Sequence, residues 1–274
     1  TSNIWAHRYS VDGLNGGSPF VTKTPSAEGG YIKVNDYTIQ SAVGGLSACG
    51  SASEIMPIGT LAHETGHTFD LPDLYDTRGN SQGIGHYGLM GAGNYARPYS
   101  PSRMEGWSLL ELGWVKADTL TTTGTLTLNP VQTSDSVRIL KTQTTGEYFI
   151  LENRAYLESD TAQMNPAWGT QSKSPGLYIW HIDQTRINQG SPFNTINTGA
   201  IQGVALVQAD GLNELLAGTN RGNVGDAYPG STNNTAVDGT TAPGLRTNSG
   251  VVVPGRIDSI RIVGNAGLLR YRVE

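Results

Sequence analysis

LAHETGHTFDLPDLYD, residues 61–76, is the stretch that determines what this 274-residue chain is built around. It carries two histidines four residues apart, His63 and His67, with a glutamate directly after the first. On a helix, residues four apart lie one above the other, so both imidazoles can face a common ion. Neutral imidazole nitrogens suit zinc, and Glu64 projects near the same face, where it can accept a proton from a metal-activated water. Such a histidine pair also occurs by chance in helices, so whether it forms a zinc site depends on the residues that follow it.

Those residues include a candidate for the third metal ligand, because a catalytic zinc ion held by two histidines needs one more protein ligand and an open position. Asp70 continues the same helical face, but helical rise places it about 10 Å along the axis from His63. Pro72 disfavours helical geometry at Leu71, so the chain turns before it reaches Asp73. We therefore predict that Asp73 is the third ligand and that Asp70 has a structural or supporting role.

The composition of the chain is typical of secreted β-rich proteins, because charged residues make up only 15% of it and glycine is abundant. The net charge is −5 and no run of lysine or arginine is present, so we expect no nucleic-acid partner. No apolar stretch approaches the length of a membrane span. The single Cys49 cannot form an internal disulfide. Because Thr1 opens directly on strand-like sequence, we expect a processed chain.

The sequence predicts one strong helix and a shorter second one. The first is expected to begin between Ser53 and Pro57, since serine caps well and proline is tolerated in a first turn, and to end near Phe69. The second is expected over residues 100–113, with Ser100 as its cap.

Strand-like segments surround these helices. Two precede the first helix, at 3–11 and 31–43, and the rest follow Leu120 at short intervals, with turn residues between them. The later candidates are 125–130, 137–143, 147–156, 176–183, 203–210, 259–264 and 268–274. We predict an α+β fold, with a zinc-helix lobe at 1–118 followed by a mostly antiparallel β lobe at 119–274.

The zinc motif and its surroundings resemble the metzincin zinc peptidases in their His-His-Asp form, and LPDLYD at 71–76 narrows the resemblance to the immune inhibitor A-type peptidases of bacteria. Further similar segments follow in matching order: IWAHR (4–8), GLMGAGNY (88–95), LGW (112–114), EYFILENR (147–154), GLYIWHID (176–183), QADG (208–211) and GDAYPG (225–230). The resemblance implies a metzincin-like lobe with zinc held by His63, His67 and Asp73. It also implies that Glu64 is the general base and that Met90 lies in the turn beneath the metal.

The chain departs from the metzincin pattern at two positions. Asp70 stands where glycine is usual, at a point that often requires a positive φ, which aspartate tolerates at some cost. Two residues past the methionine, Ala92 replaces a tyrosine that helps to hold the oxyanion in some metzincins. Tyr87, His86 and Tyr95 are the candidates for that role, and the alternative for each is simple packing in a glycine-rich loop.

Two groups of oxygen donors also suggest structural calcium. Asp70 and Asp76 with the carbonyls of the following loop form one group, and Asn220, Asn223 and Asp226 form the other. Resemblance to the family adds weight to calcium. Turns closed by their own side chains are the slightly favoured alternative at each site.

Two further expectations concern what surrounds the zinc helix. Strand alternation predicts that Glu152, Arg154, His181 and Asp183 form a buried network that is structural rather than catalytic. An extended substrate should lie antiparallel to an edge strand, for which 31–43 is the candidate, although an interior position for that strand is nearly as well supported.

The family resemblance also implies several strands and a helix before the segment at 4–8. We therefore expect a retained amino-terminal fragment of the same precursor as a partner, or an exposed, unpaired strand at that edge.

The leading interpretation is a secreted bacterial zinc endopeptidase that hydrolyses peptide bonds of protein or peptide substrates. The first alternative is a non-catalytic, zinc-stabilised β-rich module that binds a glycan or a protein. Glu64 argues against that alternative, because a structural zinc site needs no base. The second alternative is a metal-dependent hydrolase with another class of substrate, and only the family resemblance separates it from a peptidase.

Overall fold

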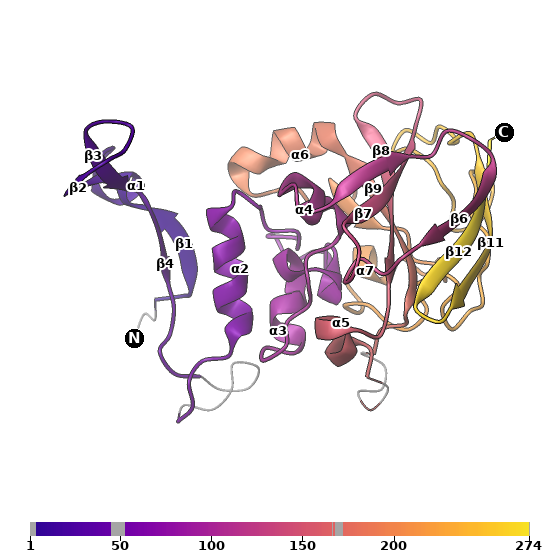
Figure 1. Ribbon diagram of the computed structural model, residues 1–274, viewed down its shortest axis with the longest axis horizontal. Coiled ribbons are helices and arrows are strands. Elements are labelled where there is room, and N and C mark those ends of the chain that lie inside the picture. Colours follow the sequence, from indigo (N-terminus) through magenta and orange to yellow (C-terminus); the bar gives the residue numbers. More distant parts are fainter. Residues whose placement is uncertain (1–3, 45–52, 166, 168–171, 274) are drawn as a thin grey trace.

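Helix α2 (Ile58–Thr68) stands between two β-containing parts of the molecule, as Figure 1 shows. The computed structural model describes residues 4–44, 53–165, 167 and 172–273, so Cys49 lies outside the described residues. The first four strands lie on one side of α2, and the larger sheets lie on its other side. The architecture is mixed α and β with several antiparallel sheets, as expected.

The amino-terminal part consists of two separate strand pairs. Strand β1 (His7–Ser10) pairs antiparallel with β4 (Asp36–Ile39), and β2 (Phe20–Pro25) pairs antiparallel with β3 (Tyr31–Val34). A short helix, α1 (Val11–Asn15), follows β1.

The expected single strand over 31–43 is therefore wrong, because Asn35 divides it into β3 and β4. The side-chain oxygen of Asn35 accepts a hydrogen bond from the Asp12 amide, and its backbone oxygen accepts one from Val11. These contacts turn the chain, and the two halves pair with different strands.

Helix α2 (Ile58–Thr68) carries the histidine motif. Pro57 takes the N-cap position with no side-chain hydrogen bond, so the expected serine cap is wrong. The helix ends at Phe69, and Asp70 follows with φ of +63°. This confirms the expected positive φ at the position where aspartate replaces glycine.

The chain after α2 is irregular and mostly buried. It contains the short helical segments η2 (Gly85–Tyr87), η3 (Leu89–Gly93) and α3 (Asn94–Ala96), followed by α4 (Gly106–Glu111). Helix α4 starts later than predicted because Glu105, not Ser100, caps it. The Glu105 carboxylate accepts a hydrogen bond from the Ser108 amide at 2.8 Å.

A five-stranded sheet forms the centre of the molecule in the order β10-β9-β8-β7-β5. Its strands are β5 (Lys116–Thr119), β7 (Ser136–Lys141), β8 (Glu147–Arg154), β9 (Gly176–Asp183) and β10 (Val204–Leu206). All neighbours pair antiparallel except β5 and β7, which are parallel.

A three-stranded antiparallel sheet lies at the far end, with β6 (Gly124–Leu128) and β11 (Arg256–Val263) on either side of β12 (Ala266–Arg272). Among the described residues of this half of the chain, sequence analysis missed four short helical segments, because one or two turns leave too little periodicity to recognise. They are α5 (Glu158–Gln163), α6 (Gln184–Gly190), η5 (Ser191–Phe193) and α7 (Glu214–Ala217).

The main hydrophobic core draws on both halves of the chain. Leu74 and Met90 belong to the same buried cluster as Trp180 and Ile182 of β9. A second cluster lies between the five-stranded and three-stranded sheets.

The division into lobes at 118/119 stays a prediction. Within the described part of the chain, no helix has both the length and the apolar character needed to cross a membrane.

Candidate metal centre

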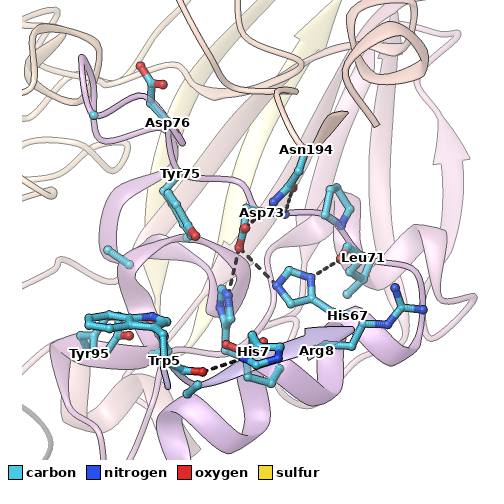
Figure 2. A pocket seen from close by; sticks show the side chains of 18 of the residues that line it. Trp5, His7, Arg8, His67, Leu71, Asp73, Tyr75, Asp76, Tyr95 and Asn194 are labelled. Carbon is cyan, nitrogen blue, oxygen red and sulfur yellow. Dashed lines mark hydrogen bonds and ion pairs between the residues drawn. The ribbon is translucent and has the colours of Figure 1, made fainter. Parts of the chain in front are cut away.

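Three predicted ligands converge beside α2. The Nε2 atoms of His63 and His67 lie 3.0 and 3.3 Å from Oδ1 of Asp73. The two imidazole rings are nearly perpendicular, with centroids 4.9 Å apart. Figure 2 shows Asp73 facing His67 across this space. Asp73 reaches it because the chain turns after α2, whereas Asp70 is exposed at the end of the helix.

Backbone carbonyls hold the far nitrogen of each histidine. Nδ1 of His63 lies 2.8 Å from the carbonyl oxygen of Leu89, and Nδ1 of His67 lies 2.7 Å from that of Leu71. A carbonyl can only accept, so each Nδ1 carries a proton and donates it. In the neutral form of each ring, the lone pair of Nε2 is therefore directed at Asp73. Metal-binding histidines are typically oriented in this way.

This donor set fits a divalent cation. Two imidazole lone pairs and a carboxylate oxygen point at one another, an arrangement that repels unless a proton or a cation lies between them. Burial alone raises the pKa of Asp73, but hydrogen bonds from His63 and His67 lower it far below its usual range. Burial alone lowers the pKa of His67, and the hydrogen bond and charge of Asp73 raise it overall. A site of two nitrogens and one oxygen suits zinc.

Met90 lies against α2, and its place in a turn beneath a metal stays a prediction. Its side chain is fully buried, and a Cβ added at Gly66 would come within 2.5 Å of its sulfur. Glycine at position 66 thus allows the close approach. The Met90 carbonyl accepts a hydrogen bond from the Leu74 amide at 2.8 Å, which ties this turn to the segment that carries Asp73.

A cleft of about 1040 Å³ opens over the three ligands. Glu64 lines it together with His63 and His67, and so can meet a molecule bound there. Strand β1 contributes His7, Arg8 and Tyr9 to the wall, so among the described residues β1, rather than the segment 31–43, is the strand that borders the site. Figure 2 shows Trp5, His7 and Arg8 on this side of the site.

The predicted candidates for holding an oxyanion lie in different places. Tyr87 is buried, and its hydroxyl donates to Asp226 at 2.5 Å, on the side of the second half of the chain. His86 is largely buried, which lowers its pKa to about 3. Among the described residues that line the cleft, only Tyr95 of the three predicted candidates is present.

Tyr75 is a cleft residue that sequence analysis missed. Its ring stacks on that of His63 with centroids 6.3 Å apart, and its phenol points toward the same space as the Asp73 carboxylate (Figure 2). Burial first, and then the charge of Asp73, raise the pKa of Tyr75, so its hydroxyl stays protonated and can donate. The hint that the sequence offered is that Tyr75 lies two residues after Asp73, the third candidate ligand.

The residues considered for calcium are distributed differently from the prediction. Asp76 is buried with Oδ1 accepting from the Arg78 amide, and its Oδ2 has no hydrogen-bond partner among the described residues. Asp226 gathers with two acids that sequence analysis did not single out, Asp210 and Glu214, with ligand oxygens within 4.8 Å of one another. Asn223 donates from its side chain to Glu214 at 2.6 Å.

The predicted single network of Glu152, Arg154, His181 and Asp183 is divided in two: Arg154 pairs with Glu152, whereas His181 and Asp183 are linked through Glu147 and Asn248. Arg154 donates to Glu152 at 2.8 Å and to the Tyr87 carbonyl at 2.7 Å, all within the core. His181 lies 2.8 Å from a carboxylate oxygen of Glu147. The pair of Arg154 and Glu152 therefore connects β8 with the turn before Met90.

Comparison with known proteins agrees with this geometry. Residues 1–118 match the sequence model of the immune inhibitor A peptidase M6 catalytic domain. The matched segment is somewhat less than half of the 274-residue chain, and it contains all three metal-ligand candidates and Glu64.

Two kinds of curated relative are similar to part of the chain. The chain is 33% identical over 99 residues to "Immune inhibitor A" of Bacillus thuringiensis subsp. alesti, which covers 34% of this chain and 12% of that protein. It is 26% identical over 110 residues to "Pre-pro-metalloprotease PrtV" of Vibrio cholerae serotype O1, covering 38% and 11%. The matches thus span about a tenth of the length of these relatives.

Proposed function

We propose that the chain is a secreted bacterial zinc endopeptidase that hydrolyses peptide bonds within proteins. The convergence of His63 Nε2, His67 Nε2 and Asp73 Oδ1 below an open cleft carries this proposal. The match of residues 1–118 to the M6 catalytic-domain model and the similarity to "Immune inhibitor A" and "Pre-pro-metalloprotease PrtV" support it.

His63, His67 and Asp73 would hold the metal, which supplies Lewis-acid polarisation of a water and of the scissile carbonyl when bound. Glu64 lines the cleft one residue from His63. Its carboxylate takes the proton of the attacking water and later gives it to the leaving amine. The hydroxyl of Tyr75 donates a hydrogen bond to the carbonyl oxygen as negative charge develops on it. Tyr95 is the remaining predicted candidate for that role.

We propose that an extended substrate lies along β1. This strand lines the cleft, and β4 is its only partner strand among the described residues. An open strand edge offers amide and carbonyl groups with which a peptide can pair.

Calcium is a second proposed ion, at the cluster of Asp210, Glu214 and Asp226. Burial, followed by the charges of Asp226 and Glu214, raises the pKa of Asp210, which indicates acids close enough to repel one another. Calcium would relieve that repulsion. Thermal unfolding with and without calcium tests this, with Asp210→Asn as the variant and exposed Asp135→Asn as the control. A calcium-dependent rise in Tm that Asp210→Asn leaves unchanged would contradict the proposed site.

A further proposed partner is a retained amino-terminal fragment of the same precursor. The side chains of Ile58 and Leu61 of α2, of Phe69 at its C-cap, and of the apolar residues of β2 and β3 are exposed. An apolar surface of this kind is typically covered. Peptide mapping of the protein purified from culture medium tests the proposal, and a preparation without any associated peptide would contradict it.

Proteolysis with and without a chelator tests the main proposal. The purified protein should cleave denatured casein, lose that activity in a zinc chelator and regain it when zinc is restored. Zinc binding without cleavage would favour the β-rich binding module. Cleavage that survives complete removal of the metal would refute a zinc mechanism.

A further inference from the structure

Asn194 contacts the candidate ligand Asp73 from the other half of the chain, 121 residues away. Its side-chain oxygen accepts a hydrogen bond from the Asp73 amide at 2.9 Å. Its side-chain nitrogen donates to Oδ2 of Asp73 at 2.5 Å. One amide side chain therefore holds both the backbone and the carboxylate of Asp73, as Figure 2 shows.

The two oxygens of the Asp73 carboxylate therefore have different partners. Oδ2 is occupied by Asn194, and Oδ1 faces Nε2 of both histidines. The terminal torsion of an aspartate is broad, so a carboxylate without such a partner can rotate away from a metal. The hydrogen bond from Asn194 selects the orientation in which one oxygen completes the donor set.

Asn194 is itself held in an uncommon conformation, with φ of +51° and ψ of +45° at the end of η5. Its carbonyl oxygen accepts a hydrogen bond from the Thr77 hydroxyl at 3.1 Å. The Asn194 backbone is therefore fixed to the far end of the same segment that carries Asp73. Asparagine adopts this left-handed conformation more readily than most residues do.

The loop of residues 191–198, here called the 191–198 loop, holds the ligand segment at a further point. Asn197 is fully buried, and its side-chain nitrogen donates to the carbonyls of Leu74 and Val204 at 2.8 Å each. Its side-chain oxygen accepts from the Val204 amide at 3.0 Å. The loop is thus anchored to β10 of the central sheet, which gives Asn194 a rigid base.

We propose that Asn194 is a positioning residue for the metal ligand Asp73, so that the 191–198 loop completes the metal centre from outside the segment matched to the M6 family. The inference rests on the proposed zinc site. It assigns no contact with substrate to Asn194. It predicts that the affinity for zinc depends on a residue far from the histidine motif in the sequence.

The test measures zinc affinity by competition with a chromogenic chelator, using the whole chain. In Asn194→Gly both hydrogen bonds to Asp73 are lost while the positive φ remains easy to adopt. Asn194→Asp keeps an acceptor for the Asp73 amide but places a second carboxylate beside Oδ2. Asn233→Gly is the matched control, because Asn233 is exposed and also has a positive φ of +53°.

We expect Asn194→Gly and Asn194→Asp each to weaken zinc binding about 10–100-fold, as loss of a supporting hydrogen bond typically does. Asn233→Gly should bind zinc within about twofold of the parent chain. The cobalt-substituted variants at Asn194 should show altered d–d absorption, which a change in general stability would not produce. Circular dichroism of the metal-free proteins checks that each variant is folded.

A folded Asn194→Gly chain with unchanged zinc affinity and cobalt spectrum would overturn the proposal. If that variant does not fold, the same result for Asn194→Asp would overturn it. A parent chain that binds zinc but cleaves no protein would refute the proposed peptidase function alone, because the affinity comparison does not depend on cleavage.

Discussion

The three aspartates that follow the zinc helix have three different environments. Asp70, with its positive φ, is exposed and ends the helix. Asp73 is buried against both histidines, and Asp76 is buried in the next turn. Similar side chains thus differ in role because the backbone turns at Leu71 and Pro72. The helical rise and the proline were sufficient to predict which aspartate reaches the histidines.

Tyr75 provides the sharpest test at the scale of one residue. Tyr75→Phe keeps the ring that stacks on His63 but removes the hydroxyl that we propose as the donor to the oxyanion. We expect kcat to fall about 10²-fold, because one such donor typically contributes that much, while zinc affinity stays unchanged. Steady-state peptide cleavage at saturating zinc measures this.

Tyr95→Phe is the matched control, since Tyr95 lines the same cleft. A larger loss of kcat in Tyr95→Phe than in Tyr75→Phe would assign the role to Tyr95 instead. The sequence alone could not separate these tyrosines, because the choice depends on which ring stacks beside the ligands. From the sequence, Tyr87 was an equally good candidate for the oxyanion donor, but in the structure its hydroxyl donates to Asp226.

At the scale of an element, α4 shows how burial changes the chemistry of a helix cap. Glu105 is fully buried, and it caps the helix by accepting from the amide and the hydroxyl of Ser108 at 2.8 and 2.6 Å. Burial raises the pKa of Glu105, and the hydrogen bonds from Ser108 oppose that rise. Its other carboxylate oxygen has no hydrogen-bond partner among the described residues.

This cap predicts a definite pH dependence. A raised pKa means that folded Glu105 keeps its proton at pH values where the unfolded chain has lost it. The free energy of unfolding should therefore fall, relative to that of Glu105→Gln, as pH rises from the unfolded pKa to the folded one. Denaturant unfolding between pH 4 and 8 measures the difference. Glu28→Gln, at an exposed glutamate, is the control and should show no such trend. A difference that stays level or grows in favour of glutamate would contradict the prediction.

The elements themselves were predictable to different degrees. The long strands β8 and β9 were predicted closely, because their apolar and β-branched content is continuous. The division of 31–43 at Asn35 was not predictable, since it depends on contacts with Asp12 and Val11 made by the folded chain. The late start of α4 was likewise not predictable, because Glu105 is a good cap only where the folded chain holds its carboxylate beside Ser108.

At the scale of the whole molecule, one buried ion pair connects the central sheet to the metal-binding part. Arg154 bonds to Glu152 and to the Tyr87 carbonyl, and Glu152 also accepts from the Trp180 indole at 2.9 Å. Removing the cation would leave a buried carboxylate without its counter-charge. Arg154→Met should therefore lower the free energy of unfolding by about 3–5 kcal/mol, as urea unfolding would measure.

Two comparisons make that prediction specific. The double variant Glu152→Leu/Arg154→Met should be less destabilised than Arg154→Met alone, because both charges are gone. Arg138→Met, which breaks the pair with largely exposed Asp118, should cost at most about 1 kcal/mol. If Arg154→Met costs no more than Arg138→Met, the buried pair does not connect the two parts as described.

The arrangement of the whole molecule was the least predictable feature. The strand pattern after Leu120 predicted a β-rich second half, but not that Asn194 and Asn197 would reach back to the ligand segment. Contacts across 121 residues leave no periodic signal in one sequence. For the same reason the acidic cluster of Asp210, Glu214 and Asp226 became visible only once the chain had folded.

The central claim is that Glu64 acts on water beside a metal held by His63, His67 and Asp73. The most direct test compares Glu64→Gln with the parent chain for both zinc affinity and cleavage of denatured casein. We predict zinc affinity within about threefold of the parent and a loss of cleavage of at least about 10²-fold, the size of a general-base contribution. A Glu64→Gln protein that cleaves casein at the parent rate would contradict the account.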